Sequence, residues 1–329
     1  MKRTITYPKE ALIALTYRCN ARCHMCNTWM YPTRSEDEVT PMDLASLPDD
    51  LVFCNITGGE PFLRTDIGAF VELMSRKAKR IVVSTNGYFT ERIVELSRQF
   101  PSLGIRVSIE GLAEVNDELR GLPGGFERGL DTLRQLQSLG RKDIGFGITL
   151  SDRNIMDVMG LYALGEKMQM EFATACVHNS YYFHKFDNRV TRIEDFRAEL
   201  QKLMGCLLKS RRLKNWYRAY FNHGLLNFAQ GGKRALPCEA ARSVFFIDPF
   251  AHVMACNGMD MPMGDLKKDS FIDIWQSSRA REVCRAAAAC EKQCWMIGTV
   301  SPAIKRHPVA PTRWVIRNKL RIALGKEIV

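Results

Sequence analysis

The sequence lacks the features that mark membrane-spanning, secreted and low-complexity proteins. Its 329 residues contain no uninterrupted apolar run of about 18 residues, the length that a membrane-spanning helix needs. The amino-terminal stretch "MKRTITYPKE" has no apolar segment of the kind found in signal peptides. Internal repeats and low-complexity segments are also absent. With 46% hydrophobic and 25% charged residues, the composition predicts an ordinary globular protein, and the lack of a signal-like segment predicts a cytoplasmic location.

The chain also lacks a surface pattern typical of nucleic-acid binding. Its net charge is +11, but the basic residues are scattered and no platform of aromatic and basic residues stands out. One dense basic region, "KRHPVAPTRWVIRNKLRIALGK", resembles a peripheral membrane helix. Projected as a helix, however, the arginines of residues 313–326 lie between Leu320 and Leu324 on one side and Trp314 on the other. We therefore favour a docked carboxy-terminal helix, with weak membrane contact as the alternative.

Eleven cysteines are present without a signal peptide, which argues against a secreted disulfide scaffold. We expect them to be reduced, and either metal-binding or buried. Cys54, Cys176 and Cys206 lie inside apolar segments, where a cysteine behaves as a small buried residue.

Short apolar runs alternate with amphipathic, helix-length segments from residue 11 to about residue 177. Such runs indicate strands buried on both faces, as in a parallel sheet. The expected strands are 11–16, 51–57, 80–85, 104–109, 144–150 and 171–177, and the expected helices between them are 66–79, 90–98, 126–139 and 154–168. This order predicts an α/β fold, a partial (β/α)6 barrel of the TIM type, with its chemistry at the carboxyl ends of the strands.

The alternation of strand-like and helix-like segments ends after the expected barrel. Two helices are expected within residues 192–230, and "VFFIDPFAHVMAC" predicts two strands around a turn. The predicted divisions are a core barrel, a helical connector, a small α+β region rich in cysteine and a basic tail, at residues 1–190, 191–234, 235–300 and 301–329.

Three cysteines follow the first expected strand in a C-x3-C-x2-C pattern, at Cys19, Cys23 and Cys26. A structural zinc site needs four protein ligands, whereas three ligands with an open position suit a metal that also binds an exchangeable group. Closely spaced thiolates are typical of iron–sulfur clusters, and three of them leave one iron free. Such a site would lie at the catalytic end of the barrel.

The stretch "TYRCNARCHMCN" resembles the cysteine loop of the radical S-adenosylmethionine (SAM) superfamily. The resemblance implies that Cys19, Cys23 and Cys26 hold a catalytic [4Fe–4S] cluster, whose open iron is chelated by the amino and carboxylate groups of SAM. Met25 matches the position that lies against the adenine in that family.

Further segments match the family in the same order along the chain. "TGGEP" resembles the motif that receives the methionine ammonium, "STNG" and "VSIEG" resemble the segments that end strands three and four, and "NDELRGLPGGFERGLDTL" resembles a segment whose arginine meets the SAM carboxylate. Taken alone, each could be an ordinary turn, cap or surface arginine. The resemblance implies the following cofactor-binding residues: Gly58, Gly59, Glu60, Ser84, Asn86, Ser108 and Arg120.

The carboxy-terminal cysteines resemble the SPASM/twitch extension of this superfamily. The resemblance implies one auxiliary [4Fe–4S] cluster, with these ligands: Cys238, Cys256, Cys290 and Cys294. Cys284 is a spare that could replace Cys290. A second auxiliary cluster is not expected, because Arg281 stands where the full pattern has a cysteine and no cysteine follows position 294. A four-cysteine zinc site is the alternative.

The resemblance implies a radical SAM enzyme. Reduced flavodoxin or ferredoxin would supply an electron that cleaves SAM to a 5′-deoxyadenosyl radical, which abstracts hydrogen from a substrate. The loop after strand six, "VHNSYYFHKFDN", offers acid/base and stacking groups at His178, Tyr181, Tyr182 and His184, although these side chains could also serve packing alone. Weaker candidates are Tyr217, His223 and Lys233.

Two other functions remain open at this point. Because the first strand begins at about residue 11, we expect no amino-terminal peptide-recognition domain and favour a small non-peptide substrate, such as a sugar, nucleotide or lipid-linked intermediate. The alternatives are a peptide-modifying maturase of the same superfamily, and a non-catalytic iron–sulfur or zinc protein.

Overall fold

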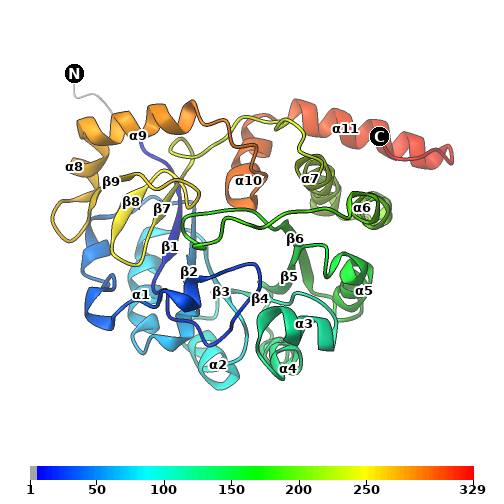
Figure 1. Ribbon diagram of the computed structural model, residues 1–329. Coiled ribbons are helices and arrows are strands. Elements are labelled where there is room, and N and C mark those ends of the chain that lie inside the picture. Colours follow the sequence, from blue (N-terminus) through cyan, green and yellow to red (C-terminus); the bar gives the residue numbers. More distant parts are fainter. Residues whose placement is uncertain (1–5) are drawn as a thin grey trace.

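The structure, a computed structural model, describes residues 6–329 and contains a curved nine-stranded sheet (Figure 1). Its first six strands are parallel neighbours in chain order: β1 (Glu10–Ala14), β2 (Phe53–Thr57), β3 (Ile81–Thr85), β4 (Gly104–Ser108), β5 (Ile144–Leu150) and β6 (Glu171–Cys176). On the other side of β1 the sheet continues through β7 (Val244–Ile247), β8 (His252–Met254) and β9 (Pro262–Asp265).

The two faces of the barrel strands differ in chemistry. Ile13, Ile56 and Ile105 point outward, where their side chains are almost fully buried in the main hydrophobic core. Residues with the opposite orientation, such as Asn55 and Ser84, are only half-buried and line a cavity inside the barrel. Because successive side chains of a strand point to opposite faces, the outer face makes the core and the inner face makes a lumen.

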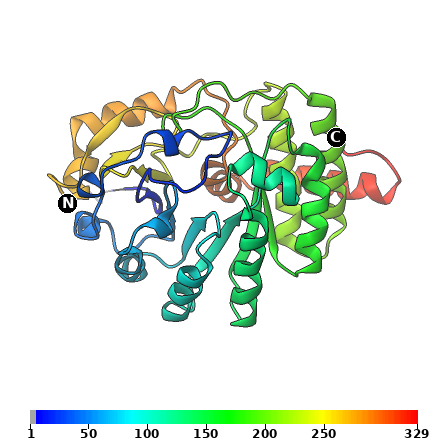
Figure 2. The same ribbon diagram turned by 60° about the horizontal axis from the view of Figure 1, so that its bottom comes forward.

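Helices cover the outer face of the sheet (Figures 1 and 2). Those of the barrel are α1 (Ile67–Lys77), α2 (Thr90–Gln99), α3 (Ala113–Arg120), α4 (Gly125–Ser138) and α5 (Val158–Lys167). They are followed by α6 (Ile193–Lys209), α7 (Leu213–Ala229), α8 (Phe271–Gln276), α9 (Ser278–Ala288), α10 (Ile297–Arg306) and α11 (Val309–Ala323). Helix α7 packs on β6 and α10 packs on β7, so these two helices border the open side of the partial barrel.

The predicted fold class is confirmed: all six barrel strands are present, with small shifts at their ends. The two strands expected after residue 243 are β7 and β8. The sequence did not indicate that β7 would pair in parallel with β1, from Glu10↔Val244 to Ile13↔Ile247. This pairing makes one sheet across the predicted boundary at residue 234, and the domain divisions stay a prediction.

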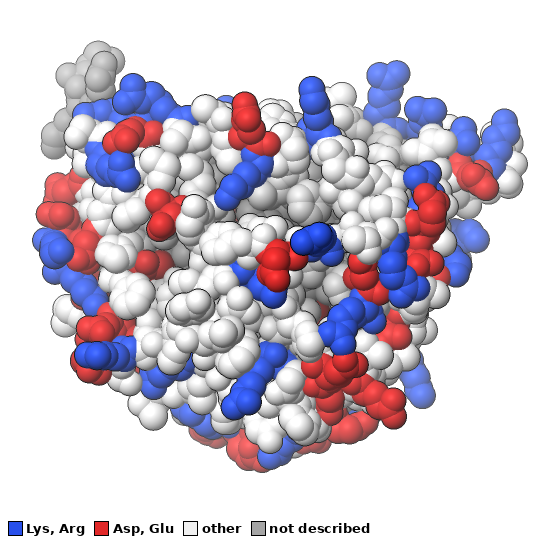
Figure 3. Space-filling model, viewed as in Figure 1, with Lys and Arg blue, Asp and Glu red and all other residues white. Residues whose placement is uncertain are grey.

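The carboxy-terminal helix α11 docks on α7 and α6. Trp314 lies with its ring centroid 5.7 Å from that of Tyr220 and 4.9 Å from that of His223, and Val315 is buried beside it. Lysine and arginine side chains project along the edge of the molecule where α11 lies (Figure 3). The docked helix with a solvated basic edge is therefore what the structure shows.

Among residues 6–329, none of the helices combines the length and apolar character that crossing a bilayer requires.

Candidate active site

The loop that carries Cys19, Cys23 and Cys26 follows β1, and all three thiols are half-buried. The carboxyl end of α3 holds this loop through two backbone hydrogen bonds: Arg22 N–H donates to the Arg120 carbonyl at 2.7 Å, and His24 N–H donates to the Leu119 carbonyl at 2.9 Å. The three cysteines are thus presented together at the carboxyl end of the barrel strands.

A buried charge network braces the start of the cysteine loop. Glu38 accepts hydrogen bonds from Arg18 Nε at 2.9 Å and Nη2 at 2.7 Å, from Thr33 at 2.6 Å, and from Thr16. Arg64 donates to Glu38 at 3.2 Å as well. Two arginines and two threonine hydroxyls thus donate to this carboxylate, and these bonds offset the free-energy cost of burying its charge. The network fixes the backbone just before Cys19.

The two glycines at 58 and 59 lie directly against the same backbone. Gly59 N–H donates to the Thr16 carbonyl at 2.6 Å, and Glu60 N–H donates to the Arg18 carbonyl at 2.8 Å. A Cβ atom at Gly59 would lie 2.3 Å from the Arg18 carbonyl oxygen. The lack of a side chain therefore allows the loop after β2 to pair with the cysteine loop.

Glu60 is fully buried, and protein donors surround its carboxylate. It accepts hydrogen bonds from Asn86 N–H at 2.7 Å, from Thr85 Oγ1 at 2.8 Å and from Phe62 N–H at 3.1 Å. Burial raises the pKa of Glu60, against the lowering effect of these donors. Asn86 also donates to Asn20 Oδ1 at 2.7 Å, so this cluster joins the ends of β2 and β3 to the cysteine loop. The predicted contact of Glu60 with the SAM ammonium stays a prediction.

Arg120 lies buried among the cysteines and pairs with Glu110, with 3.2 Å between Nη1 and Oε1. Glu110 also accepts a hydrogen bond from Thr149 N–H at 2.5 Å. Burial lowers the pKa of Arg120, but the nearby Cys23, Glu110 and Cys19 raise it overall. Its Nε atom is buried without a hydrogen-bond partner in the described residues. Arg120 thus places a positive charge and an unused hydrogen-bond donor beside Cys19 and Cys23.

The remaining predicted cofactor residues lie around the same end of the barrel. Ser84 and Ser108 line the lumen, and Ser84 accepts a hydrogen bond from Asn55 Nδ2 at 3.0 Å. Met25 is half-buried against the main core. Gly58 accepts a hydrogen bond on its carbonyl from the Tyr182 hydroxyl at 2.6 Å.

The residues present fit a thiolate-bound cluster and an anionic group of a cofactor. Burial raises the pKa of Cys19 to about 12 and that of Cys23 to about 11, so the bare thiols hold their protons at neutral pH. Ligands must lose their protons when they bind metal, and the positive charge of Arg120 compensates thiolates there. Its unpartnered Nε suits a carboxylate.

The loop after β6 bridges the two cysteine-bearing regions of the chain. Asn27 N–H donates to the Phe183 carbonyl at 2.8 Å, and Asn188 Nδ2 donates to the Met25 carbonyl at 3.1 Å. In the other direction, Ser180 Oγ donates to the carbonyl of Asn257, the residue after Cys256, at 2.6 Å. The predicted substrate loop therefore contacts both cysteine loops. The sequence interpretation did not identify Asn27 or Asn188 as residues that make these contacts.

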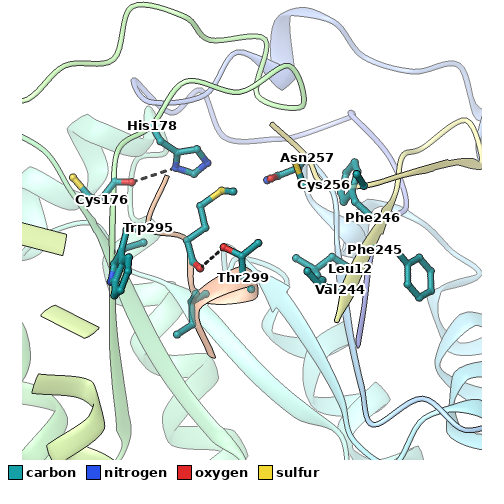
Figure 4. A pocket seen from close by; sticks show the side chains of 15 residues that line it. Leu12, Cys176, His178, Val244, Phe245, Phe246, Cys256, Asn257, Trp295 and Thr299 are labelled. Atoms are coloured by element: carbon teal, nitrogen blue, oxygen red, sulfur yellow. Dashed lines mark hydrogen bonds between the residues drawn. The ribbon is translucent and has the colours of Figure 1, made fainter. Parts of the chain in front are cut away.

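The four candidate substrate residues of this loop differ in surroundings. His178 projects into a cavity of about 180 Å³ that Cys256 and Trp295 also line, and its Nε2 has no partner in the described residues (Figure 4). Tyr182 is buried, Tyr181 is exposed, and the His184 ring lies 5.0 Å from Tyr17 and 4.7 Å from Tyr31. Their roles in substrate binding stay a prediction.

The weaker candidates are dispersed. Tyr217 lines the lumen and hydrogen-bonds Thr312 at 2.9 Å, His223 packs on Trp314, and Lys233 is exposed.

Cys238, Cys290 and Cys294 lie near enough to Cys256 for their charges to affect its thiol. Burial raises the pKa of Cys256 to about 11, and the charges of the other three add to that shift. Cys284 lies apart on α9 and packs on the main core. The ligand role of the set predicted from the sequence stays a prediction.

Arg234 is a residue that the sequence interpretation missed. Its Nε donates to the Leu236 carbonyl at 2.8 Å, and its Nη1 donates to the Cys294 carbonyl. Burial lowers the pKa of Arg234, while Cys238 and Cys294 act in the opposite direction. Like Arg120 at the first site, this cation lies beside cysteines. The one sequence signal for a role beside these cysteines was the position of Arg234, four residues before Cys238.

Among residues 6–329, no three His, Cys, Asp or Glu side chains converge closely enough to hold a single metal ion. The four-cysteine zinc site and the auxiliary cluster therefore both stay predictions for the carboxy-terminal cysteines.

Two family models match the chain where these two groups of cysteines lie. One is described as the radical SAM superfamily and matches residues 13–163, and the other is described as the SPASM iron–sulfur cluster-binding domain and matches residues 238–295. The chain carries a radical SAM domain and a SPASM domain. These domains imply a [4Fe–4S] cluster, SAM and auxiliary iron–sulfur binding, as the sequence predicted.

Curated proteins similar to this chain include some that are named synthases of Fe-coproporphyrin III or heme and others that are named maturases. The Fe-coproporphyrin III synthase of Methanosarcina barkeri is 30% identical over 161 residues, which are 46% of this chain but only 40% of that protein. The AdoMet-dependent heme synthase of the same organism is 24% identical over 314 residues and covers 87% of both chains. The mycofactocin maturase MftC of Mycolicibacterium smegmatis is 25% identical over 304 residues, 84% of this chain and 73% of that protein.

A solved structure shares the fold. Streptococcus suis SuiB aligns with a TM-score of 0.66 at 16% identity, over 86% of this chain and 68% of that one. At this identity the likeness shows the fold alone.

Proposed function

We propose that this protein is a radical SAM enzyme that abstracts hydrogen from a small non-peptide biosynthetic intermediate, with one auxiliary cluster beside the substrate. A [4Fe–4S] cluster and SAM bound at the first cysteine loop supply the reducing electron and the 5′-deoxyadenosyl radical. The observation that carries the proposal is the bridge made by the loop after β6, which joins the first cysteine loop to the segment of Cys256. This loop therefore links the catalytic site to the auxiliary site on the proposal.

The protein residues have separable tasks on this proposal. Cys19, Cys23 and Cys26 hold the cluster, and Arg120 directs its free donor at the carboxylate of SAM. Glu60 contacts the methionine ammonium of SAM, and its bonds to Thr85 and Asn86 hold the loop after β2 in place.

The substrate class is supported by the lumen and by the relatives. The lumen is a cavity of about 750 Å³ bordered by α7 and α10, a size suited to a small molecule. Two relatives are by name synthases of Fe-coproporphyrin III and heme. The peptide-maturase alternative is kept because of the likeness to the maturase MftC.

Two partners complete the proposal. Reduced flavodoxin or ferredoxin is the expected electron donor. Weak peripheral membrane contact through α11 is also proposed, since Ile316, Leu320 and Leu324 are exposed there beside the exposed Arg313 and Arg317.

The direct test is SAM turnover by the reconstituted protein. Under anaerobic conditions with dithionite, we expect release of 5′-deoxyadenosine, detected by chromatography, and transfer of deuterium into it from a labelled substrate. Failure of the reconstituted protein to bind SAM would contradict the proposed enzyme and favour a non-catalytic iron–sulfur protein.

A further inference from the structure

The lumen has a basic end. Lysine and arginine side chains line it near the amino-terminal ends of the strands and on the two helices that border the open side: Arg80, Arg106, Lys214, Arg218 and Lys305. The middle of the lumen is instead lined by small and apolar residues such as Gly147, Ala173, Ala175 and Phe221. The cavity therefore changes from apolar to cationic along its length.

The carboxylates near this end do not balance the cations. Asp143 accepts hydrogen bonds from both Arg80, at 2.8 Å, and Arg106, at 2.5 Å. Glu171 is likewise shared, by Lys214 at 2.6 Å and by Arg218.

Glu10 pairs with Lys305 at 3.3 Å. The five cations thus meet three carboxylates, and two positive charges remain in excess at this end of the lumen. Water solvates Arg80, Lys214 and Lys305, which are 47%, 59% and 65% exposed, so Arg106 and Arg218 are the cations of this end with the least access to water.

Arg106 and Arg218 both line this end of the lumen, and both lie near Glu171. Burial is the largest effect that lowers the pKa of Arg218, and the positive charge of Arg106 lowers it further. Their side chains are about one-fifth exposed, at 21% and 23%. In the described residues, Glu171 is the single acceptor of the Arg218 guanidinium, so most of its donors are available to a ligand.

We propose that the substrate carries a carboxylate or phosphate group, which binds between Arg106 and Arg218 at the basic end of the lumen. Guanidinium groups are well suited to both oxyanions. Arg106 donates Nη1 to the carbonyls of Ile105, at 3.0 Å, and Asp143, at 2.8 Å, and Nη2 to the Asp143 carboxylate, so its Nε and one Nη2 hydrogen remain for a ligand. Arg106 and Ser108 lie on one face of β4, so the proposed anion site and a candidate SAM residue line the same lumen. This inference rests on the proposed function, because it assigns the lumen to the substrate.

The test measures the binding of two probes to the reconstituted, SAM-loaded protein by isothermal titration calorimetry. Pyrophosphate represents phosphate and tricarballylate represents carboxylate, so the tighter probe identifies the source of the oxyanion. We expect the Arg218→Gln and Arg106→Gln variants to bind the tighter probe at least tenfold more weakly. Arg218→Lys keeps the ion pair with Glu171 but loses the planar fork, and should bind a few-fold more weakly.

The matched control is Arg197→Gln, which removes a cation from an exposed ion pair on α6. Probe binding should stay unchanged in this variant. The inference is overturned if neither probe binds the wild type, or if Arg218→Gln, Arg218→Lys and Arg197→Gln all bind like the wild type. Release of 5′-deoxyadenosine by the same wild-type preparation is scored separately, so loss of the inference and loss of the proposed function are distinguishable.

Discussion

Replacing Gly59 with alanine is expected to abolish at least 99% of SAM cleavage. The new Cβ would lie 2.3 Å from the Arg18 carbonyl oxygen and 2.7 Å from the Tyr17 carbonyl oxygen, so the loop after β2 must move away from the cysteine loop. Overpacking of this kind costs about 2–3 kcal/mol of stability. A displacement of about 1 Å at a reacting centre reduces the rate by roughly 100-fold. Both effects are measured on one preparation, by urea unfolding and by 5′-deoxyadenosine release.

Gly205→Ala is the matched control for this substitution. Gly205 lies within α6, and a Cβ there meets nothing within 4 Å. Alanine should therefore leave SAM cleavage unchanged and raise the free energy of unfolding by up to about 1 kcal/mol. Equal SAM cleavage by Gly59→Ala and the wild type would show that the close approach of the two loops is not required.

Replacing Arg120 with methionine is expected to lower the free energy of unfolding by about 3–5 kcal/mol, because Glu110 is left buried without its countercharge. We also expect SAM affinity to fall at least tenfold, since the unpartnered Nε is lost. Urea unfolding and equilibrium binding of SAM measure the two effects independently.

A double variant separates these two roles of Arg120. Adding Glu110→Gln removes the buried charge but keeps an acceptor for Thr149 N–H, so most of the lost stability should return. SAM affinity should stay low. A double variant that binds SAM as tightly as the wild type would exclude Arg120 from SAM binding.

Much of the barrel could be predicted because its outer strand faces are apolar and bounded by turn residues. Helix α3 was not predicted, since its inner face buries Asn116 and Arg120 in place of an apolar stripe. These two polar residues serve the site: Asn116 accepts from Glu110 N–H at 2.8 Å, and Arg120 pairs with the Glu110 carboxylate. Where a site requires buried polar residues, hydrophobic periodicity does not predict the helix that carries them.

The candidate site could also be predicted only in part, where its residues have a local sequence signal. Motif resemblance identified the cysteines and the glycines, because their spacing is local in the sequence. The structure adds that Gly59 lies against the Arg18 backbone, and the contact of the glycines with the cofactor stays a prediction. The bridging role of Asn188, which bonds to Met25 across 163 positions, depends on the folded chain and has no local signal. The pairing of β7 with β1 is long-range in the same way.

The most direct measurement is the iron content and SAM cleavage of the Cys19→Ala, Cys23→Ala, Cys26→Ala triple variant after anaerobic reconstitution. The wild type should bind about eight iron atoms, in two cubane clusters, and release 5′-deoxyadenosine. The triple variant should bind about four and release none. Cys206→Ala, in α6, should match the wild type in both respects. A triple variant that retains about eight iron atoms, or still cleaves SAM, would contradict the assignment of the first cysteine loop as the catalytic cluster site.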